Sequence, residues 1–205
     1  MIADLLNRGC DCTVTDLPKL RERIETHAHV FAEMPVFLDS VHVSQMRRIV
    51  EAIEATTRLS AYREAVLGEA HELALIDPGA CGVFMGFDFH ITPAGPRLIE
   101  INTNAGGAFL NIAAQGAQRS CCPAADSYIE ARRTTGPVEA EIVAMFRREW
   151  ALARGDAPLR SIAIVDVEPR GQFLYPEFQL AQQLFQSHGL RAHIADPAEL
   201  ELADD

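Results

Sequence analysis

The sequence predicts an α/β protein in which helices and an antiparallel hairpin come first and a parallel strand–helix–strand unit follows. Three observations predict this class. Apolar residues recur at helical spacing in residues 1–75, at every second position between 83 and 102, and in two short runs, 161–167 and 190–195, that flank a helical pattern. We therefore expect a first region over 1–157 and an incomplete Rossmann-like βαβ region over 158–205.

The first part of the chain is predicted to be a helical scaffold. Asp16 is a candidate helix cap, with Pro18 in the first turn and an expected end near His29. A second helix is expected after Ser44 and a third after Ser60. No residue of this region suggests a chemistry.

An antiparallel hairpin is predicted next, after a turn at Asp77-Pro78-Gly79. A five-residue loop, 92–96, is expected to join the two alternating segments, and it contains two prolines and a glycine. This loop pairs Ile91 with Arg97 and fixes the predicted register of the remaining pairs.

In that register Asp88 lies opposite Glu100, and Gly86 lies opposite Asn102. The alternation of apolar residues supports it, because a slip of one residue would mix the polar and apolar faces. The side chains expected on the apolar face are Met85, Phe87, Phe89, Ile99 and Ile101.

The remaining elements complete the predicted α/β order. The chain turns at Gly106-Gly107 into a helix, and a further helix is expected over 138–154. Strands over 161–167 and 190–195 flank a helix with Pro176 in its first turn, which predicts a parallel pair. Two parallel strands leave an apolar run uncovered. We therefore expect a homo-oligomer, with cover by helix 138–154 as the alternative.

The polar face of the hairpin carries the strongest chemical signal. Two facing carboxylates, Asp88 and Glu100, repel each other unless a cation lies between them. Together with the amide of Asn102 they form an oxygen-only ligand set, which suits Mg²⁺. A polar strand face that simply meets water fits the same pattern, so the residues alone leave both interpretations open.

The run from Leu98 to Gly107 (LIEINTNAGG), preceded by Gly-Phe-Asp-Phe-His at 86–90, resembles the metal-binding hairpin of ATP-grasp ligases. A hairpin followed by a βαβ unit is similar in order to the circularly permuted eukaryotic-type glutathione synthetases. The phrase Gly-Pro-Arg-Leu-Ile-Glu-Ile-Asn over 95–102 is also similar to the glutathionylspermidine synthase group. The resemblance covers residues 81–200. It implies ATP and Mg²⁺ as cofactors and a chain that corresponds to the N-terminal half of such a ligase.

The resemblance also implies roles for individual residues. Glu100 and Asn102 match the Mg²⁺ ligands, and Asp88 matches an acid that supports the metal or the acyl-phosphate site, where we place it as the catalytic candidate. Two departures are visible: those families have an arginine where this chain has Gly86, and the lysines that hold ATP phosphates are absent, since Lys19 is the only lysine. The loop expected to lie along the acceptor substrate is Asn104, Ala105, Gly106 and Gly107.

Composition excludes several classes of function. The net charge of −11 argues against nucleic-acid binding, and no apolar run is long enough to span a membrane. The N-terminus has no signal-peptide pattern, so a cytoplasmic protein is expected. The five cysteines have neither zinc nor disulfide-framework spacing and are expected to be thiols; a nucleophile at Cys121 or Cys122 is a minor alternative.

Two function hypotheses follow. The first is a fragment of an ATP-dependent carboxylate–amine ligase that joins small-molecule substrates through an acyl phosphate and is inactive alone. The second is a non-catalytic module of the same fold that binds a metabolite or a partner.

Overall fold

The computed structural model describes residues 13–15, 37–120 and 135–201. The chain divides into two compact units: an N-terminal unit of residues 1–8 and 37–105, and a C-terminal unit of residues 9–36 and 106–205. The sequence placed its boundary at 157/158 instead. The helices between 106 and 157 belong to the C-terminal unit because they pack on its βαβ element. The helix predicted after Asp16, Lys19 and four of the cysteines (Cys10, Cys12, Cys121 and Cys122) lie outside the described residues.

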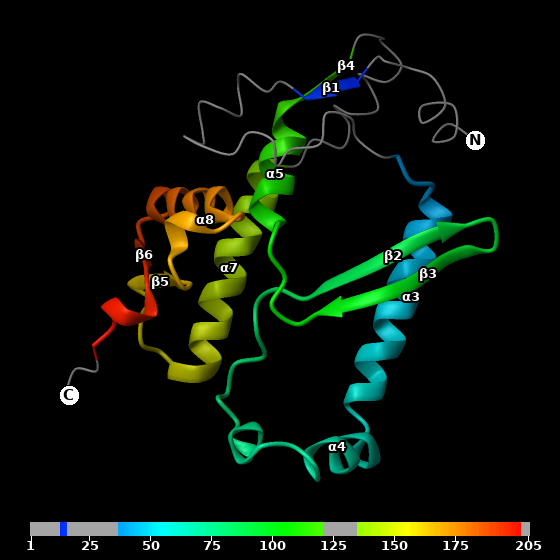
Figure 1. Cartoon of the computed structure of the whole chain (residues 1–205), viewed down its shortest axis with the longest axis horizontal. Coiled ribbons are helices and arrows are strands. Elements are labelled where there is room, and N and C mark those ends of the chain that lie inside the picture. The colour runs from blue at the N-terminus through cyan, green and yellow to red at the C-terminus, as the bar shows by residue number, and fades with distance from the viewer. Residues whose placement is uncertain (1–12, 16–36, 121–134, 202–205) are drawn as a thin grey trace. The chain divides into compact units, whose positions relative to one another are not determined.

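The first described helix of the N-terminal unit is α3, Ser40–Thr57, which starts five residues before the predicted start at residue 45. The N-cap residue is Asp39, which has an extended backbone. Ser44 therefore lies inside the helix, where its hydroxyl donates a hydrogen bond to the Ser40 carbonyl. Helix α4, Ser60–Leu67, starts one residue before the predicted start at residue 61. A 3₁₀ turn, Glu72–Leu75, and the predicted turn at Asp77 lead to the hairpin (Figure 1).

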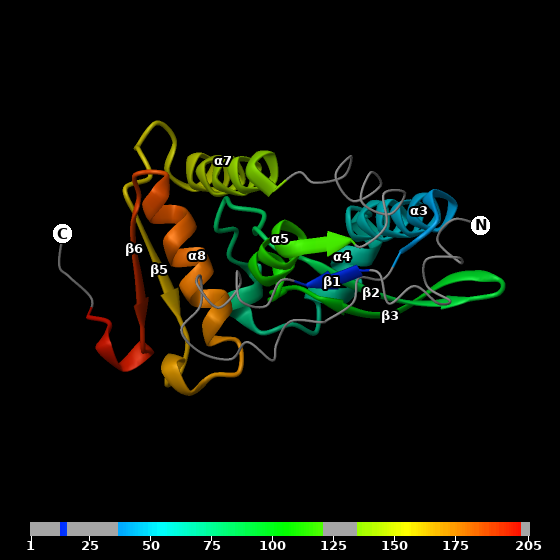
Figure 2. The ribbon, with the colours of Figure 1, turned by 90° about the horizontal axis from the view of Figure 1, so that it is seen from above.

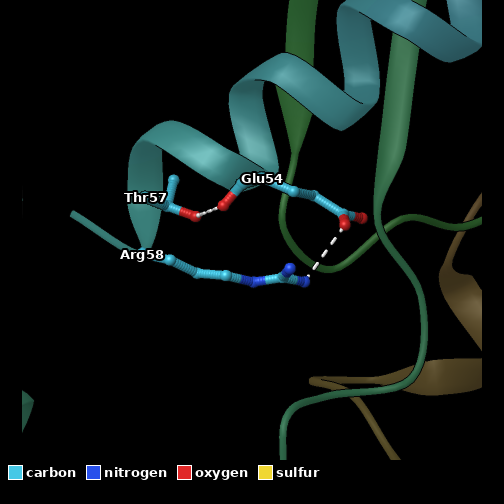
Figure 3. A network of polar contacts seen from close by, with 3 residues as sticks. All are labelled: Glu54, Thr57 and Arg58. Atoms are coloured by element: carbon cyan, nitrogen blue, oxygen red, sulfur yellow. Dashed lines mark hydrogen bonds and ion pairs between the residues drawn. The ribbon is translucent and has the colours of Figure 1, made fainter.

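The C-terminal end of α3 carries a small polar network (Figure 3). Thr57 donates to the Glu54 carbonyl over 2.9 Å, and the Arg58 guanidinium lies 3.3 Å from the Glu54 carboxylate. Both charged side chains are exposed, so this ion pair contributes at most a few tenths of a kcal/mol.

The hairpin consists of β2, Gly86–Thr92, and β3, Gly95–Asn102, with α3 packed along β3. The predicted five-residue loop is wrong: the strands are joined by the two residues Pro93 and Ala94. Thr92 closes this turn by donating its hydroxyl hydrogen to the Gly95 carbonyl over 2.8 Å and accepting the Ala94 N–H over 3.2 Å. Gly95 leaves the turn with φ of 104°, which a glycine adopts without strain.

The C-terminal unit contains the predicted parallel βαβ element: β5, Ser161–Val165, helix α8, Tyr175–Ser187, and β6, Arg191–Ala195. Two further helices are α5, Ala108–Ala117, and α7, Thr135–Arg154. Short antiparallel strands β1, Thr13–Thr15, and β4, Gln118–Ser120, pair with each other. The mixed α/β class is therefore confirmed for the described residues (Figures 1 and 2).

The core of the C-terminal unit forms around Phe185 of α8, which is 1% exposed. The rings of Phe146 from α7 and Phe109 from α5 meet it edge-on, with centroids 4.8 and 6.1 Å away. Helix α8 also packs on both strands, so α8 and not the predicted helix 138–154 covers the parallel pair. The side chains of Ile162 and Ile164 are half-buried as a result.

A buried carboxylate joins two of these helices. Glu177 in the first turn of α8 is 6% exposed and accepts the backbone N–H of Phe109 over 3.0 Å and of Leu110 over 2.8 Å. These are donors of the first turn of α5, which have no partner within their own helix. Burial raises the pKa of the Glu177 carboxyl above its ordinary 4.5, and the backbone N–H groups at the α5 N-terminus lower it in part.

We predict that Glu177→Ala lowers the free energy of unfolding by about 3 kcal/mol, because two buried N–H donors lose their acceptor. Urea denaturation measures this loss. Glu141→Ala, on the exposed face of α7, is the matched control and should change stability by less than about 0.5 kcal/mol. Equal effects of the two substitutions would contradict the capping role.

The raised pKa of Glu177 predicts a pH dependence of stability. Between the ordinary 4.5 and the raised folded value, the folded state binds more protons than the unfolded state. The free energy of unfolding therefore falls as pH rises through this window, by at most about 1.4 kcal/mol per pH unit, and then levels off. Glu177→Gln removes this contribution, so denaturation curves of the two proteins between pH 4 and 8 should differ by a pH-dependent amount. A constant difference would show that the pKa is not raised.

Candidate functional site

A β-bulge decides which side chains of the hairpin face each other. Asp88 pairs with Glu100 but Phe89 pairs with Leu98, so Ile99 is an extra residue without a partner on β2. Between the turn and Phe89 the short turn offsets the strand pairing by one residue from the predicted register. Beyond the bulge, from Asp88 to Gly86, the pairing matches the predicted register again. The predicted opposition of Asp88 and Glu100 is therefore confirmed, although the predicted loop is wrong.

The bulge also changes the predicted apolar face. Leu98, not Ile99, lies opposite Phe89, and Ile99 is 64% exposed. Met85 precedes β2 and is 51% exposed. Sequence alternation assigned Ile99 to the covered face because it assumed an unbroken strand, and a bulge reverses the parity of every residue beyond it.

The two facing carboxylates of the hairpin are open to solvent. Asp88 and Glu100 are both exposed, and neither carboxylate makes a hydrogen bond or ion pair with a described residue. Like charges directly opposite each other destabilise a strand pair. Asn102 is half-buried and lies opposite Gly86, two pairs along the ladder and therefore on the same face. The arrangement leaves carboxylate and amide oxygens available to a hard cation.

These residues fit a divalent ion by donor chemistry and by position. Two carboxylates and an amide are oxygen donors of the kind Mg²⁺ takes alongside substrate phosphates. Within the described ranges, no group of three or more His, Cys, Asp or Glu side chains is placed to hold a metal. The hairpin set has two such side chains, so the remaining ligands would come from a bound molecule.

Gly86 is held close to the loop that follows β3. A β-carbon at this position would lie 3.0 Å from the Cβ of Ala105 and 3.5 Å from the Cβ of Asn102. The Ala105 N–H points back to the Phe84 carbonyl over 3.5 Å, which keeps the loop there. An arginine at position 86, as in the families that the sequence resembles, would have to displace this loop.

The four residues predicted to follow the acceptor substrate are divided between the two units. Asn104, which is exposed, and Ala105 belong to the N-terminal unit, and Gly106 and Gly107 to the C-terminal unit. Gly107 has φ of 91° and its carbonyl accepts the N–H of Asn111, so the glycine leads directly into α5. The predicted entry into a helix directly after these glycines is confirmed, but the turn itself lies just before them, at 103–104.

The N-terminus of α5 is already occupied by a carboxylate of the chain. The Glu177 carboxylate oxygens accept hydrogen bonds from the N–H groups of Phe109 and Leu110. These are the donors that a phosphate would bind at a helix N-terminus. Sequence analysis missed this residue. Its signal was the spacing, because Glu177 falls on the same helical stripe as Leu180 and Leu184 and therefore on the buried face.

A second concave region lies at the carboxyl ends of β5 and β6, where open α/β sheets bind ligands. This cavity of about 460 Å³ is lined by polar and charged residues, including Arg170, His193 and Glu199. Glu168 takes the left-handed backbone conformation there, with φ of 45°, and donates its N–H to the Asp196 carboxylate over 2.7 Å. The backbone N–H groups of Ala198 and Glu168 lower the pKa of the Asp196 carboxyl below its ordinary value.

Comparison of the chain with protein-family models, with curated proteins and with solved structures finds no match. No described helix has the length and apolar character needed to cross a membrane. Of the five cysteines, Cys81 lies in the described part, where it is an exposed thiol. The site residues are therefore assigned from their geometry and from the resemblance.

The facing carboxylates predict a small gain in stability when one charge is removed. Glu100→Gln should raise the free energy of unfolding by a few tenths of a kcal/mol in metal-free buffer, because a like-charge pair becomes a charge–amide pair. Glu51→Gln, on the exposed side of α3, is the control and should change nothing measurable. A loss of stability in Glu100→Gln would show that its carboxylate has a favourable partner.

Proposed function

We propose that this chain is part of an ATP-dependent carboxylate–amine ligase of the ATP-grasp type, in which the hairpin holds Mg²⁺. The observation that carries the proposal is the opposition of Asp88 and Glu100, with Asn102 two pairs along the ladder on the same face. The glycine turn after β3 and the parallel βαβ element that follows support it by their order along the chain.

Each candidate residue has a role in this proposal. Glu100 and Asn102 supply the metal-binding oxygens, and Asp88 sits across the strand pair where it supports the metal or the acyl phosphate. Mg²⁺ supplies neutralisation of phosphate charge during transfer to a substrate carboxylate. Asn104 to Gly107 are proposed to line the path of the attacking amine.

The cavity beside β5 and β6 is the proposed binding place for a small-molecule substrate. Arg170 offers a bidentate donor to a carboxylate, and Glu168 and Glu199 offer acceptors to an amine. A molecule with both groups would satisfy both signs of charge.

A non-catalytic metabolite-binding module is the second candidate. It is favoured by the lysine content, since Lys19 is the only lysine and phosphate-holding lysines are therefore missing from this chain. In this case the cavity would bind its metabolite without ATP.

The hairpin is predicted to bind Mn²⁺ or Mg²⁺ weakly in this chain alone, because phosphates complete the metal's coordination in such sites. Calorimetric titration with Mn²⁺ should give a weak signal that Asp88→Asn and Glu100→Gln each abolish. Glu51→Gln is the matched control. Tight zinc binding that depends on cysteine would rule out the hairpin as the metal site.

The two candidate functions separate in an ATP-hydrolysis screen. The longest natural chain that contains this sequence should release phosphate from ATP when supplied with the correct carboxylate and amine, and Glu100→Gln should abolish the release. The 205-residue chain should release none. Metabolite binding without any ATP turnover in the longer chain would favour the second candidate.

A further inference from the structure

The two strands of the parallel pair differ at their outer edges. Arg191 donates its N–H to the Arg160 carbonyl over 3.0 Å, and Asp166 donates to the Ala195 carbonyl over 3.3 Å. The odd-numbered residues of β6 and the even-numbered residues of β5 therefore direct their backbone groups toward each other. By alternation, the backbone groups of Ser161, Ala163 and Val165 point to the outer edge of β5.

The outer edge of β6 is partly covered by its own helix. Its residue Ala192 directs its carbonyl outward, where it accepts the side-chain amides of Gln182 over 3.0 Å and Gln186 over 3.2 Å. Both glutamines come from α8, which packs on β6. A strand that approached β6 would have to displace these two hydrogen bonds.

The outer edge of β5 has no such protection. No hydrogen bond within the described ranges reaches the outward backbone groups of Ser161, Ala163 and Val165. Ser161 and Ala163 are exposed and Val165 is 43% exposed. The strand carries no charge that would repel an incoming strand. An uncharged, unpaired edge is a template for another strand.

We propose that a second copy of this chain adds to β5, antiparallel, about a two-fold axis at Ala163, so that the two parallel pairs form one four-stranded sheet. The three residues with outward backbone groups are spaced evenly about Ala163. In this register Ala163 meets its own copy, and Ser161 and Val165 meet each other twice. All three pairs use the outward N–H and C=O groups.

The residues beside these pairs are complementary in the same register. Ile162 lies opposite Ile164 of the second copy, and Arg160 lies opposite Asp166 of the second copy. These are non-hydrogen-bonded pairs, in which opposing side chains come closest. The two-fold axis forms the Arg160–Asp166 pair twice, and opposite charges in such pairs are favourable. Neither side chain has an ion pair with a described residue.

If the second copy paired with β5 in a register shifted by two residues, the opposite charges would no longer face each other. A shift by two residues in one direction places Arg160 opposite Ile164, and in the other direction it places Ile162 opposite Asp166. Each shift keeps the backbone phase but puts a charge against an isoleucine. The charge pattern of the strand and its flanks therefore selects the two-fold register centred on Ala163.

Sedimentation of the full 205-residue chain tests the proposal. The wild type should sediment at twice the 22.5 kDa chain mass at micromolar concentration. Ala163→Pro should convert it to a monomer, because proline removes an outward N–H that the β5–β6 pair does not use. Circular dichroism checks that the variant is folded. A wild-type monomer at all concentrations, or a dimer that Ala163→Pro leaves intact, would overturn the proposal.

A charge exchange gives an independent test that leaves the backbone unaltered. Arg160→Asp and Asp166→Arg each place like charges in both symmetric pairs and should raise the dimer dissociation constant about tenfold or more. The double variant Arg160→Asp/Asp166→Arg restores opposite charges and should return within about threefold of the wild type. Additive weakening in the double variant would show that the two residues do not meet and would overturn the register.

Discussion

The Glu177 carboxylate is the interaction on which the C-terminal unit depends most. A buried acid is costly unless donors surround it, and here the donors are the N–H groups of Phe109 and Leu110 at the start of α5. Because these residues are 67 and 68 positions away in the sequence, one side chain ties the glycine turn and α5 to the βαβ element. The aromatic contacts of Phe185 then build the core around this connection.

The N-terminal unit depends on a different constraint, the bulge at Ile99. A two-residue turn alone would have brought Asp88 opposite Ile99, and the candidate metal face would not exist. The extra residue on β3 restores the opposition of Asp88 and Glu100 and leaves Ile99 exposed. Bulges are common beside functional sites because they redirect side chains, which is the effect seen here.

The two units also differ in how well they cover their apolar surface. In the described part of the N-terminal unit Phe37 and Pro96 are buried, whereas Phe109, Val143, Leu180 and Phe185 are among the buried apolar side chains of the C-terminal unit. Exposed residues of the N-terminal unit include Leu73, Ile76 and Ile99. More of the exposed large apolar side chains of the described residues lie in the N-terminal unit than in the C-terminal unit.

Local patterns by themselves determined much of this protein. The alternation around Asp88, the β-branched run at Ile162 and the proline before Glu177 were sufficient to predict the hairpin, a parallel strand and the start of α8, because each element depends on spacing and propensity within a few residues. The opposition of Asp88 and Glu100 was also predicted, although through two register errors that cancelled.

Only the tertiary structure decided the remainder. The bulge at Ile99 offsets the two-residue turn that the Thr92 hydroxyl closes, and strict alternation of apolar residues contains no information on either feature. The role of Glu177 required a helix from another part of the chain to bring its unpaired N–H groups to the carboxylate. Long-range hydrogen bonds and strand offsets join residues that are distant in sequence, and for that reason no local pattern records them.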